Sequence, residues 1–245
     1  MEGKTWKDNV HFILVRPTEA GNIGAAARAI KNMGFSRLEL VNPVPYLTDE
    51  AKAMSCHAKD VLKSAKVYKT FHRAIAGKSF IAGTTRRLGS RRGLILDVRA
   101  GALPLRKAAL TNKVAILFGN EHNGLSRQEL DQCGLVLTIP SAAAFPSLNL
   151  AQSVMIVAYE LSRLETRIGP PRLVEKTKLR PLYRRIPKTL QFLGYGRKGD
   201  MDLNAEITRN LRRLFGRSGL TEWELSMLLG LCTRIERKLQ QKQQK

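Results

Sequence analysis

Short apolar runs recur along the first two thirds of the chain, and segments with helical spacing of apolar residues lie between them. Runs of this length, rich in Val, Ile, Leu and Phe, are typical of strands that are buried on both faces of a sheet. The predicted strands are residues 10–15, 38–41, 67–70, 79–83, 114–118 and 135–139. Strands that alternate with helices form a mostly parallel sheet covered on both sides, so the pattern predicts an α/β domain with about six strands.

Capping residues mark where several of the intervening helices begin or end. Gly34 follows an Ala-rich segment at the position where a glycine often ends a helix. Thr48 is a suitable N-cap, and Ser126 with Glu129 forms a capping box. The predicted helices are residues 25–33, 48 to about 64, 71–76, one that begins at the capping box, and a long one from 149 to about 166.

The composition changes after residue 167. Residues 168–185 hold three prolines among basic residues and show no sustained period, which is typical of a linker. The remainder is predicted to be wholly helical, with helices at 202–215 and, after a second capping box at Thr221, to about 241. We therefore expect an α/β domain (residues 1–167), a basic linker (168–185) and a small helical extension (186–245) that packs on the domain or on a partner subunit.

The charge of the chain is strongly unbalanced: 42 Lys and Arg face 20 Asp and Glu, a net charge of +22. Such an excess favours a polyanionic partner such as nucleic acid, because Lys and Arg displace counterions from phosphates. The alternative is a solvated cationic surface. The chain shows no run long enough to cross a membrane and no signal core at its start, and its three scattered cysteines have no metal-ligand spacing. We expect a cytoplasmic protein without a metal.

Three segments follow predicted strands, at the edge where open α/β sheets bind ligands. The first holds Gly21, Asn22, Gly24 and Arg28. The glycines predict a turn that a ligand can approach closely, followed by a helix whose free N–H groups can bind an anion. The segment lacks the spacing of dinucleotide-binding loops and the lysine of a P-loop. A simple helix entry explains it equally well.

The second and third segments are polar in unusual places. Residues 117–126 place a Gly-Asn-Glu sequence directly after the most apolar predicted strand. An ordinary turn before a capped helix explains Gly124 and Ser126 there, but it does not explain residues 119–121. Residues 139–150 lead into the last long helix of the domain, where Ser147 or Asn149 can serve as the N-cap.

Together these segments resemble a known family. The patterns N-x-G-x-x-x-R (residues 22–28), F-G-N-E-x-x-G-L-S (118–126) and I-P…S-L-N (139–149) are similar to the three motifs of the SpoU/TrmH branch of the SPOUT RNA methyltransferases. The resemblance covers about residues 8–167. Residues 211–215 and the helix after Thr221 are also similar to the helical extension of the TrmJ group, which methylates the ribose at position 32 of the tRNA anticodon loop.

The resemblance implies a fold, a cofactor and an assembly. Members of the family form a deep trefoil knot in the C-terminal part of the domain and bind S-adenosyl-L-methionine within the knotted loops. They work as homodimers in which the other subunit completes each site. The expected methyl-donor contacts in this chain are Thr84, Thr85, Arg86, Leu117, Gly119, Ile139, Pro146, Ser147, Leu148 and Asn149.

The resemblance also implies the catalytic residues. Arg28 is the expected catalytic residue, with Asn22 and Glu121 orienting it or holding the loops. The family proposal treats the arginine as a base, but a guanidinium stays protonated in proteins. Gripping the target phosphate and stabilising the developing alkoxide is physically easier. The expected RNA contacts are Arg28, Arg86, Arg87, Arg91 and Arg92.

Two other functions are compatible with these motifs. A ribosomal RNA 2'-O-methyltransferase of the same branch often carries a small RNA-binding domain before the core, whereas here the first predicted strand begins at Val10. A non-catalytic RNA-binding protein on this scaffold would be expected to have lost Arg28, Gly119 or Asn149, and all three are present. We therefore expect a tRNA (cytidine/uridine-2'-O-)-methyltransferase. His122, within the second motif, is expected to be a variable loop position.

Overall fold

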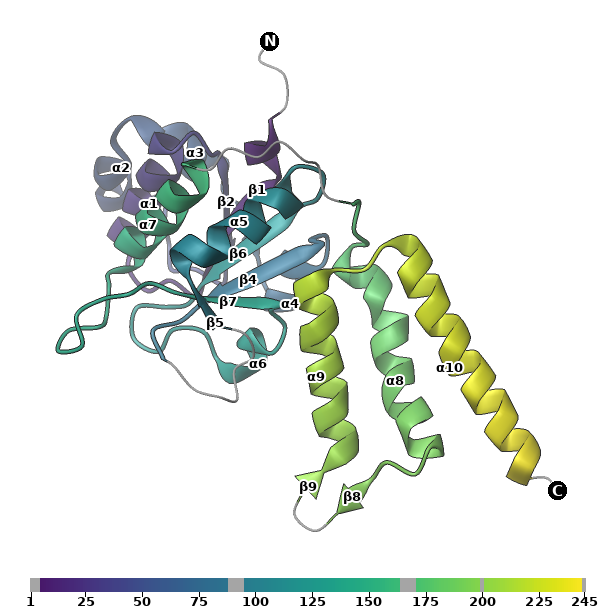
Figure 1. Ribbon diagram of the computed structural model, residues 1–245. Helices are drawn as coiled ribbons and strands as arrows, with labels where there is room; N and C mark the ends of the chain where they lie inside the picture. The colour runs from purple at the N-terminus through teal and green to yellow at the C-terminus, as the bar shows by residue number, and fades with distance from the viewer. Residues whose placement is uncertain (1–4, 88–94, 164–170, 199–200, 244–245) are drawn as a thin grey trace.

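A computed structural model describes residues 5–87, 95–163, 171–198 and 201–243. It contains a seven-stranded sheet in the order β3-β2-β1-β6-β4-β7-β5, in which every neighbouring pair is parallel (Figure 1). The strands are β1 (Val10–Val15), β2 (Arg37–Val41), β3 (Lys66–Tyr68), β4 (Phe80–Thr84), β5 (Ile95–Asp97), β6 (Val114–Phe118) and β7 (Leu135–Thr138). The α/β class and the six expected strands are confirmed. The seventh strand, β5, was not predicted.

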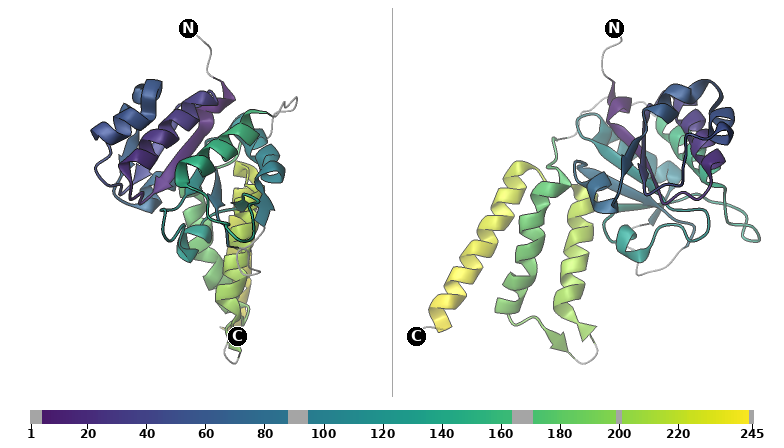
Figure 2. Two further views of the ribbon diagram at one scale, coloured as in Figure 1. Left: turned by 90° about the vertical axis from the view of Figure 1, so that its left-hand side faces the viewer. Right: turned by 180° about the vertical axis from the view of Figure 1, so that it is seen from behind.

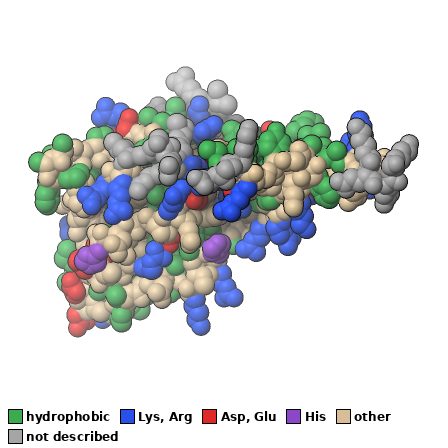
Figure 3. All heavy atoms as spheres, turned by 90° about the horizontal axis from the view of Figure 1, so that it is seen from below, with side chains coloured by type: hydrophobic (Ala, Val, Ile, Leu, Met, Phe, Trp, Pro, Cys, Tyr) green, Lys and Arg blue, Asp and Glu red, His purple; other side chains and the backbone are tan. Residues whose placement is uncertain are grey.

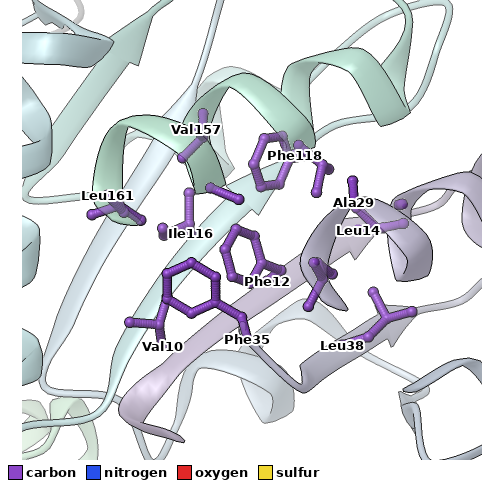
Figure 4. Packing of buried hydrophobic residues seen from close by; sticks show 14 of the residues in the cluster. Val10, Phe12, Leu14, Ala29, Phe35, Leu38, Ile116, Phe118, Val157 and Leu161 are labelled. Carbon is purple, nitrogen blue, oxygen red and sulfur yellow. The ribbon is translucent and has the colours of Figure 1, made fainter. Parts of the chain in front are cut away.

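Helices cover both faces of the sheet, as the two-sided burial of its central strands requires. The helices of the domain are α1 (Ala20–Asn32), α2 (Asp49–Ser55), α3 (Lys59–Lys63), α4 (Phe71–Ile75), α5 (Val98–Ala109), α6 (Arg127–Leu130) and α7 (Leu150–Ser162). Alternate side chains of β1 point into two separate cores: Phe12 packs under α1 and α7, whereas Ile13 packs with residues of α4 and α6. In the first core Phe12 stacks on Phe118 at a ring-centroid distance of 6.3 Å (Figure 4).

The first glycine-rich segment is helical, so the prediction of a turn there is wrong. α1 already begins at Ala20, and Gly21 to Gly24 form its first turns. A Cβ on Gly24 would lie 2.1 Å from the carbonyl oxygen of Ala51 in α2. The absence of a side chain at Gly24 thus allows α2 to pack directly against α1. The glycine serves helix packing, which the sequence pattern could not distinguish from a ligand-binding turn.

The helix predicted from Thr48 to about residue 64 is also interrupted. α2 begins after the Thr48 cap as expected, but Cys56 has a φ of +47° and ends it. A short 3-10 turn, η2 (Cys56–Ala58), then leads into α3. The break bends the segment so that α2, η2 and α3 all pack along α1.

The C-terminal part forms a layer of three helices that projects away from the domain (Figures 1 and 2). Its elements are η4 (Lys176–Leu179), α8 (Arg180–Phe192), β8 (Arg197–Lys198), β9 (Met201–Asp202), α9 (Leu203–Ser218) and α10 (Glu222–Gln243). α8 begins inside the segment expected to be a linker, with Pro181 in its first turn, where a missing N–H costs nothing. The short β8–β9 hairpin departs from the wholly helical prediction. α9 meets the domain where Gly216 packs directly on Gly134.

Candidate active site

The three segments singled out in the sequence meet at the carboxyl edge of the sheet, where the strand order reverses between β1 and β6. Asn22 on α1 is the link between them. Its Nδ2 donates to Glu121 Oε1 at 2.9 Å, and its Oδ1 accepts from Asn149 Nδ2 at 2.8 Å. One buried amide thus joins a residue of each predicted motif.

Glu121 receives further hydrogen bonds from the segment after β1. Thr18 donates to Glu121 Oε2 through its backbone N–H at 3.0 Å and through its hydroxyl at 2.8 Å. Burial alone would raise the pKa of Glu121, but the hydrogen bonds from Asn22 and Thr18 outweigh it and lower the pKa below its ordinary value. The carboxylate is therefore ionised at neutral pH, held by neutral donors.

The loop after β6 turns back on itself tightly. Gly124 has a φ of +67°, and its N–H donates to the Asn120 carbonyl at 3.0 Å. A Cβ on Gly119 would lie 2.0 Å from the carbonyl carbon of Gly124, so this position requires glycine. The side chain of Asn120 closes the turn by accepting from the Asn123 N–H at 2.7 Å.

Asn149 combines two roles. Its Oδ1 accepts from the N–H of Ala151 at 2.8 Å, which makes it the N-cap of α7, as the sequence allowed. Its amide nitrogen is the group that binds Asn22. The capping interpretation of Asn149 is therefore confirmed, and its amide also joins two of the predicted motifs.

A partly buried ion pair that the sequence did not indicate anchors the far side of the second loop. Arg16, with a φ of +52°, donates to both carboxylate oxygens of Glu129 at 2.6 and 3.0 Å. Glu129 also closes the predicted capping box with Ser126. Arg16 follows β1 and lies 113 residues before Glu129, so no local sequence pattern could have indicated the pair.

A cavity opens beside this network, between the ends of β4, β6 and β7. Eight of the ten expected donor-contact residues line it: Thr84, Thr85, Arg86, Gly119, Ile139, Pro146, Ser147 and Leu148. Leu117 does not, because its side chain is fully buried in the core, although its carbonyl accepts from Thr84 Oγ1 at 2.9 Å. Asn149 is not among the lining residues. Lining residues that were not expected include His122, Leu137 and Ser153.

The arginines expected at the site are distributed differently. Arg86 and Arg87 line the cavity. Arg28 does not line it: its side chain is exposed on α1, where Nη1 lies 3.3 Å from Cys56 Sγ. Arg91 and Arg92 lie outside the described residues. Within those residues, no group of three His, Cys, Asp or Glu side chains is placed to hold a metal ion.

Known proteins resemble this chain over nearly its whole length. Residues 9–159 match the model of the SpoU rRNA Methylase family. The tRNA (cytidine/uridine/adenosine-2'-O-)-methyltransferase TrmJ of Pseudomonas aeruginosa is 33% identical over 246 residues, which cover 94% of this chain and 95% of that relative. The tRNA (cytidine/uridine-2'-O-)-methyltransferase TrmJ of Sodalis glossinidius is 34% identical over 236 residues, covering 93% and 91%.

Solved structures resemble it as well. TrmJ from Z. mobilis ZM4 superposes with a TM-score of 0.74 at 30% identity, covering 92% of this chain and 98% of that one. A probable methylase family protein from Haemophilus influenzae superposes with a TM-score of 0.60 at 30% identity, covering 96% and 99%. In both, the match extends through the projecting helices as well as the α/β domain. Among the described helices, none has both the length and the apolar composition of a membrane span.

Proposed function

The chain belongs to the SpoU rRNA methylase family, and from this membership we propose that it transfers a methyl group from S-adenosyl-L-methionine to a ribose 2'-hydroxyl of tRNA. The observation that carries the proposal is the hydrogen-bonded junction of Asn22, Glu121 and Asn149 beside a cavity. Full-length similarity to TrmJ proteins supports tRNA as the substrate rather than ribosomal RNA. The proposed target is position 32 of the anticodon loop, in the cytoplasm.

The cavity fits a methyl donor of this kind. Its floor is apolar at Leu137 and Ile139, which suits an adenine ring, and polar groups from Thr84, Thr85 and Ser147 surround it. Gly119 also lines the cavity, and its lack of a side chain lets the main chain of Gly124 pack directly against it. When bound, S-adenosyl-L-methionine supplies an electrophilic methyl group on its sulfonium.

The residues of this chain must supply orientation and charge stabilisation. A ribose hydroxyl is a poor nucleophile that loses its proton as the oxygen accepts the methyl group. Holding the two groups in line supplies at best ~7 to 11 kcal/mol. We assign to Arg28 the stabilisation of the developing alkoxide and of the neighbouring phosphate, because a guanidinium keeps its proton. Asn22 and Glu121 are positioning residues that hold the loops together.

The proposal includes a homodimer with composite sites. Arg28 is exposed and does not line the cavity of its own chain. Its proposed role in methyl transfer therefore requires that it acts at the donor site of the partner subunit. It also includes the trefoil knot implied by the family resemblance, for which the insertion of β7 between β4 and β5 is compatible support. The domain spans residues 1–167, and the helical extension follows a linker shortened by the early start of α8 at Arg180.

Arg28→Ala tests the catalytic assignment. We expect transfer of radiolabelled methyl groups to tRNA to fall at least ~1000-fold, on the order of the loss of one preorganised charge-stabilising group. Donor affinity, measured by isothermal titration, should stay within about two-fold, because Arg28 is assigned to the alkoxide and the phosphate and not to the donor. Near wild-type turnover would refute the assignment. If the wild type binds no donor, the non-catalytic scaffold is favoured. Methylation of ribosomal RNA but not tRNA favours the ribosomal alternative.

Mixed dimers test the composite site. Gly119→Val should disrupt the donor cavity, because its side chain would collide with the main chain of Gly124 and displace the loop that lines the cavity. A dimer of one Arg28→Ala subunit and one Gly119→Val subunit keeps one intact site if Arg28 acts across the interface. Co-refolded mixtures should then regain activity that neither variant has alone. An inactive mixture that contains mixed dimers would show that Arg28 acts within its own chain.

A further inference from the structure

A second cavity, of about 410 Å³, lies between α4 of the domain and the start of the extension. We call it the junction cavity. Its lining residues are His72, Ile75, Ala76, Gln132, Lys176, Thr177, Arg180, Tyr183, Arg184 and Arg212. Four of them are Lys or Arg, and none is Asp or Glu. Viewed from below, Lys and Arg side chains gather where the extension joins the domain (Figure 3).

The walls of the junction cavity are held in place from both sides. The backbone N–H of Lys176 donates to the Lys78 carbonyl at 3.0 Å, and that of Thr177 donates to the Ala76 carbonyl at 3.3 Å. Lys176 Nζ donates to the Gln132 carbonyl. Arg212 on α9 lies over the ring of Tyr183 on α8, with its guanidinium carbon 4.9 Å from the ring centroid. The cations are thus presented by an ordered framework.

Lys and Arg residues next to the cavity-lining cations are paired with carboxylates, whereas the lining cations have no such partner among the described residues. Arg185 pairs with Glu236, Arg213 with Asp131 at 2.7 Å, and Lys178 with Glu222. Within the described part of the chain, the adjacent cavity-facing residues form no such ion pair; they are Lys176, Arg180, Arg184 and Arg212. None of the six residues in these three ion pairs lines the cavity.

The unpaired cations are also electrostatically unfavourable where they stand. Arg212 Nε is buried without a hydrogen-bond partner among the described residues. Burial lowers the pKa of Lys176 to about 8, and the charge of nearby Arg212 acts in the same direction. Arg180 and Arg184 lie near the N-terminus of α8, where the helix dipole disfavours cations and no acidic residue compensates. A bound anion would offer a hydrogen-bond acceptor to Arg212 and would offset the positive charges of Lys176, Arg180 and Arg184.

We propose that the junction cavity binds a backbone phosphate of the RNA substrate, outside the methyl-donor site. The choice of RNA as the source of the phosphate rests on the proposed function. Bidentate arginine donors match phosphate oxygens in geometry and charge, and contacts of this kind position a nucleic acid without reading its sequence. The extension thereby acts as a clamp for RNA and not only as a structural appendage.

The test is tRNA binding by fluorescence anisotropy as a function of salt. Arg180→Ala/Arg184→Ala removes two exposed cavity arginines. Arg234→Ala/Arg237→Ala on α10 removes the same charge from exposed positions outside the cavity and is the matched control. We expect the cavity variant to bind tRNA about ten-fold more weakly, with a slope of log K against log salt that is shallower by about one to two. The control should change affinity less than about three-fold.

Separate measurements keep this inference apart from the proposed function. The cavity variant should keep its melting temperature and its donor affinity and, at saturating tRNA, its turnover rate, while the KM for tRNA rises. Unchanged tRNA affinity and salt slope in a folded cavity variant would overturn the inference, even if methylation proceeds. If inorganic phosphate at millimolar concentration stabilises the wild type but not the variant while tRNA affinity is equal, the cavity binds a free anion, which also overturns it. If the wild type binds tRNA but methylates nothing, and the cavity variant loses that binding, the inference stands and the proposed function is refuted.

Discussion

A glutamate lies toward each of the two ends of the sheet, buried at Glu39 and half-buried at Glu121, and the two are held by different partners. At the carboxyl edge, Glu121 is held by neutral donors from Asn22 and Thr18. Toward the amino ends of the strands, Glu39 lies 2.7 Å from His11 Nδ1 and 2.9 Å from Lys78 Nζ. The charge of Glu39 is thus compensated within the fold, whereas that of Glu121 remains available to a cation. The arrangement around Glu39 stabilises the domain, and the arrangement around Glu121 suits a site that an arginine or a cationic ligand approaches.

The largest effect on stability is expected for Glu39→Gln. Glu39 is 2% exposed, and the substitution leaves Lys78 buried without a counter-charge. Breaking a buried ion pair by removing one partner costs about 3 to 5 kcal/mol. Urea unfolding should show this loss, while the folded protein binds the methyl donor within about two-fold of the wild type. The control is Asp60→Asn, which breaks the exposed pair with Lys31 and should cost less than about 1 kcal/mol. Equal losses in the two variants would contradict the structural role of the Glu39 cluster.

Glu121→Gln is expected to have a smaller effect on stability and a larger one on activity. The new amide group must face either Thr18 or Asn22, both of which donate to this position. Losing a hydrogen bond to a charged group costs about 1.5 to 3 kcal/mol. Methyl transfer to tRNA should fall at least ten-fold, on the order of what misplaced reacting groups cost. Wild-type kinetics in this variant would show that the carboxylate has no part in holding the site.

Mild acidification is expected to have the smallest effect. Burial lowers the pKa of His11 from its ordinary 6.5, and Glu39 and Glu121 also have lowered pKa values. Because the unfolded chain returns to ordinary pKa values, it takes up these protons first as the pH falls. The contribution of these three groups to the free energy of unfolding is therefore fully present above about pH 6.5 and is lost progressively below it, first through His11 and then through the glutamates. Urea unfolding should show a loss below about 1 kcal/mol between pH 7 and 6, and a gain would contradict this sign.

Local sequence patterns predicted the loops and helix caps of the candidate site better than they predicted the tertiary contacts around it. The three motifs, the caps at Asn149 and Ser126 and the polar residues Asn22 and Glu121 were all evident from local patterns. Eight of ten expected cavity residues are in place. Leu117 does not line the cavity, because its side chain is buried in the core, and a strand pattern does not reveal which face meets a ligand. His122 was judged a variable loop position, although it lines the cavity.

By itself, the sequence determined the alternation of strands and helices, the helix caps and the loops that carry the chemistry. These features depend on side-chain period and local backbone preference, which act over a few residues. Only the tertiary structure decided that Gly24 serves the packing of α2, that Arg28 does not line the cavity of its own chain, and that His11, Glu39 and Lys78 form one cluster. It alone brought Arg16 to Glu129 and gathered the arginines of the junction cavity. Such contacts join residues far apart in the chain, and their partners are selected by packing geometry that no local pattern records.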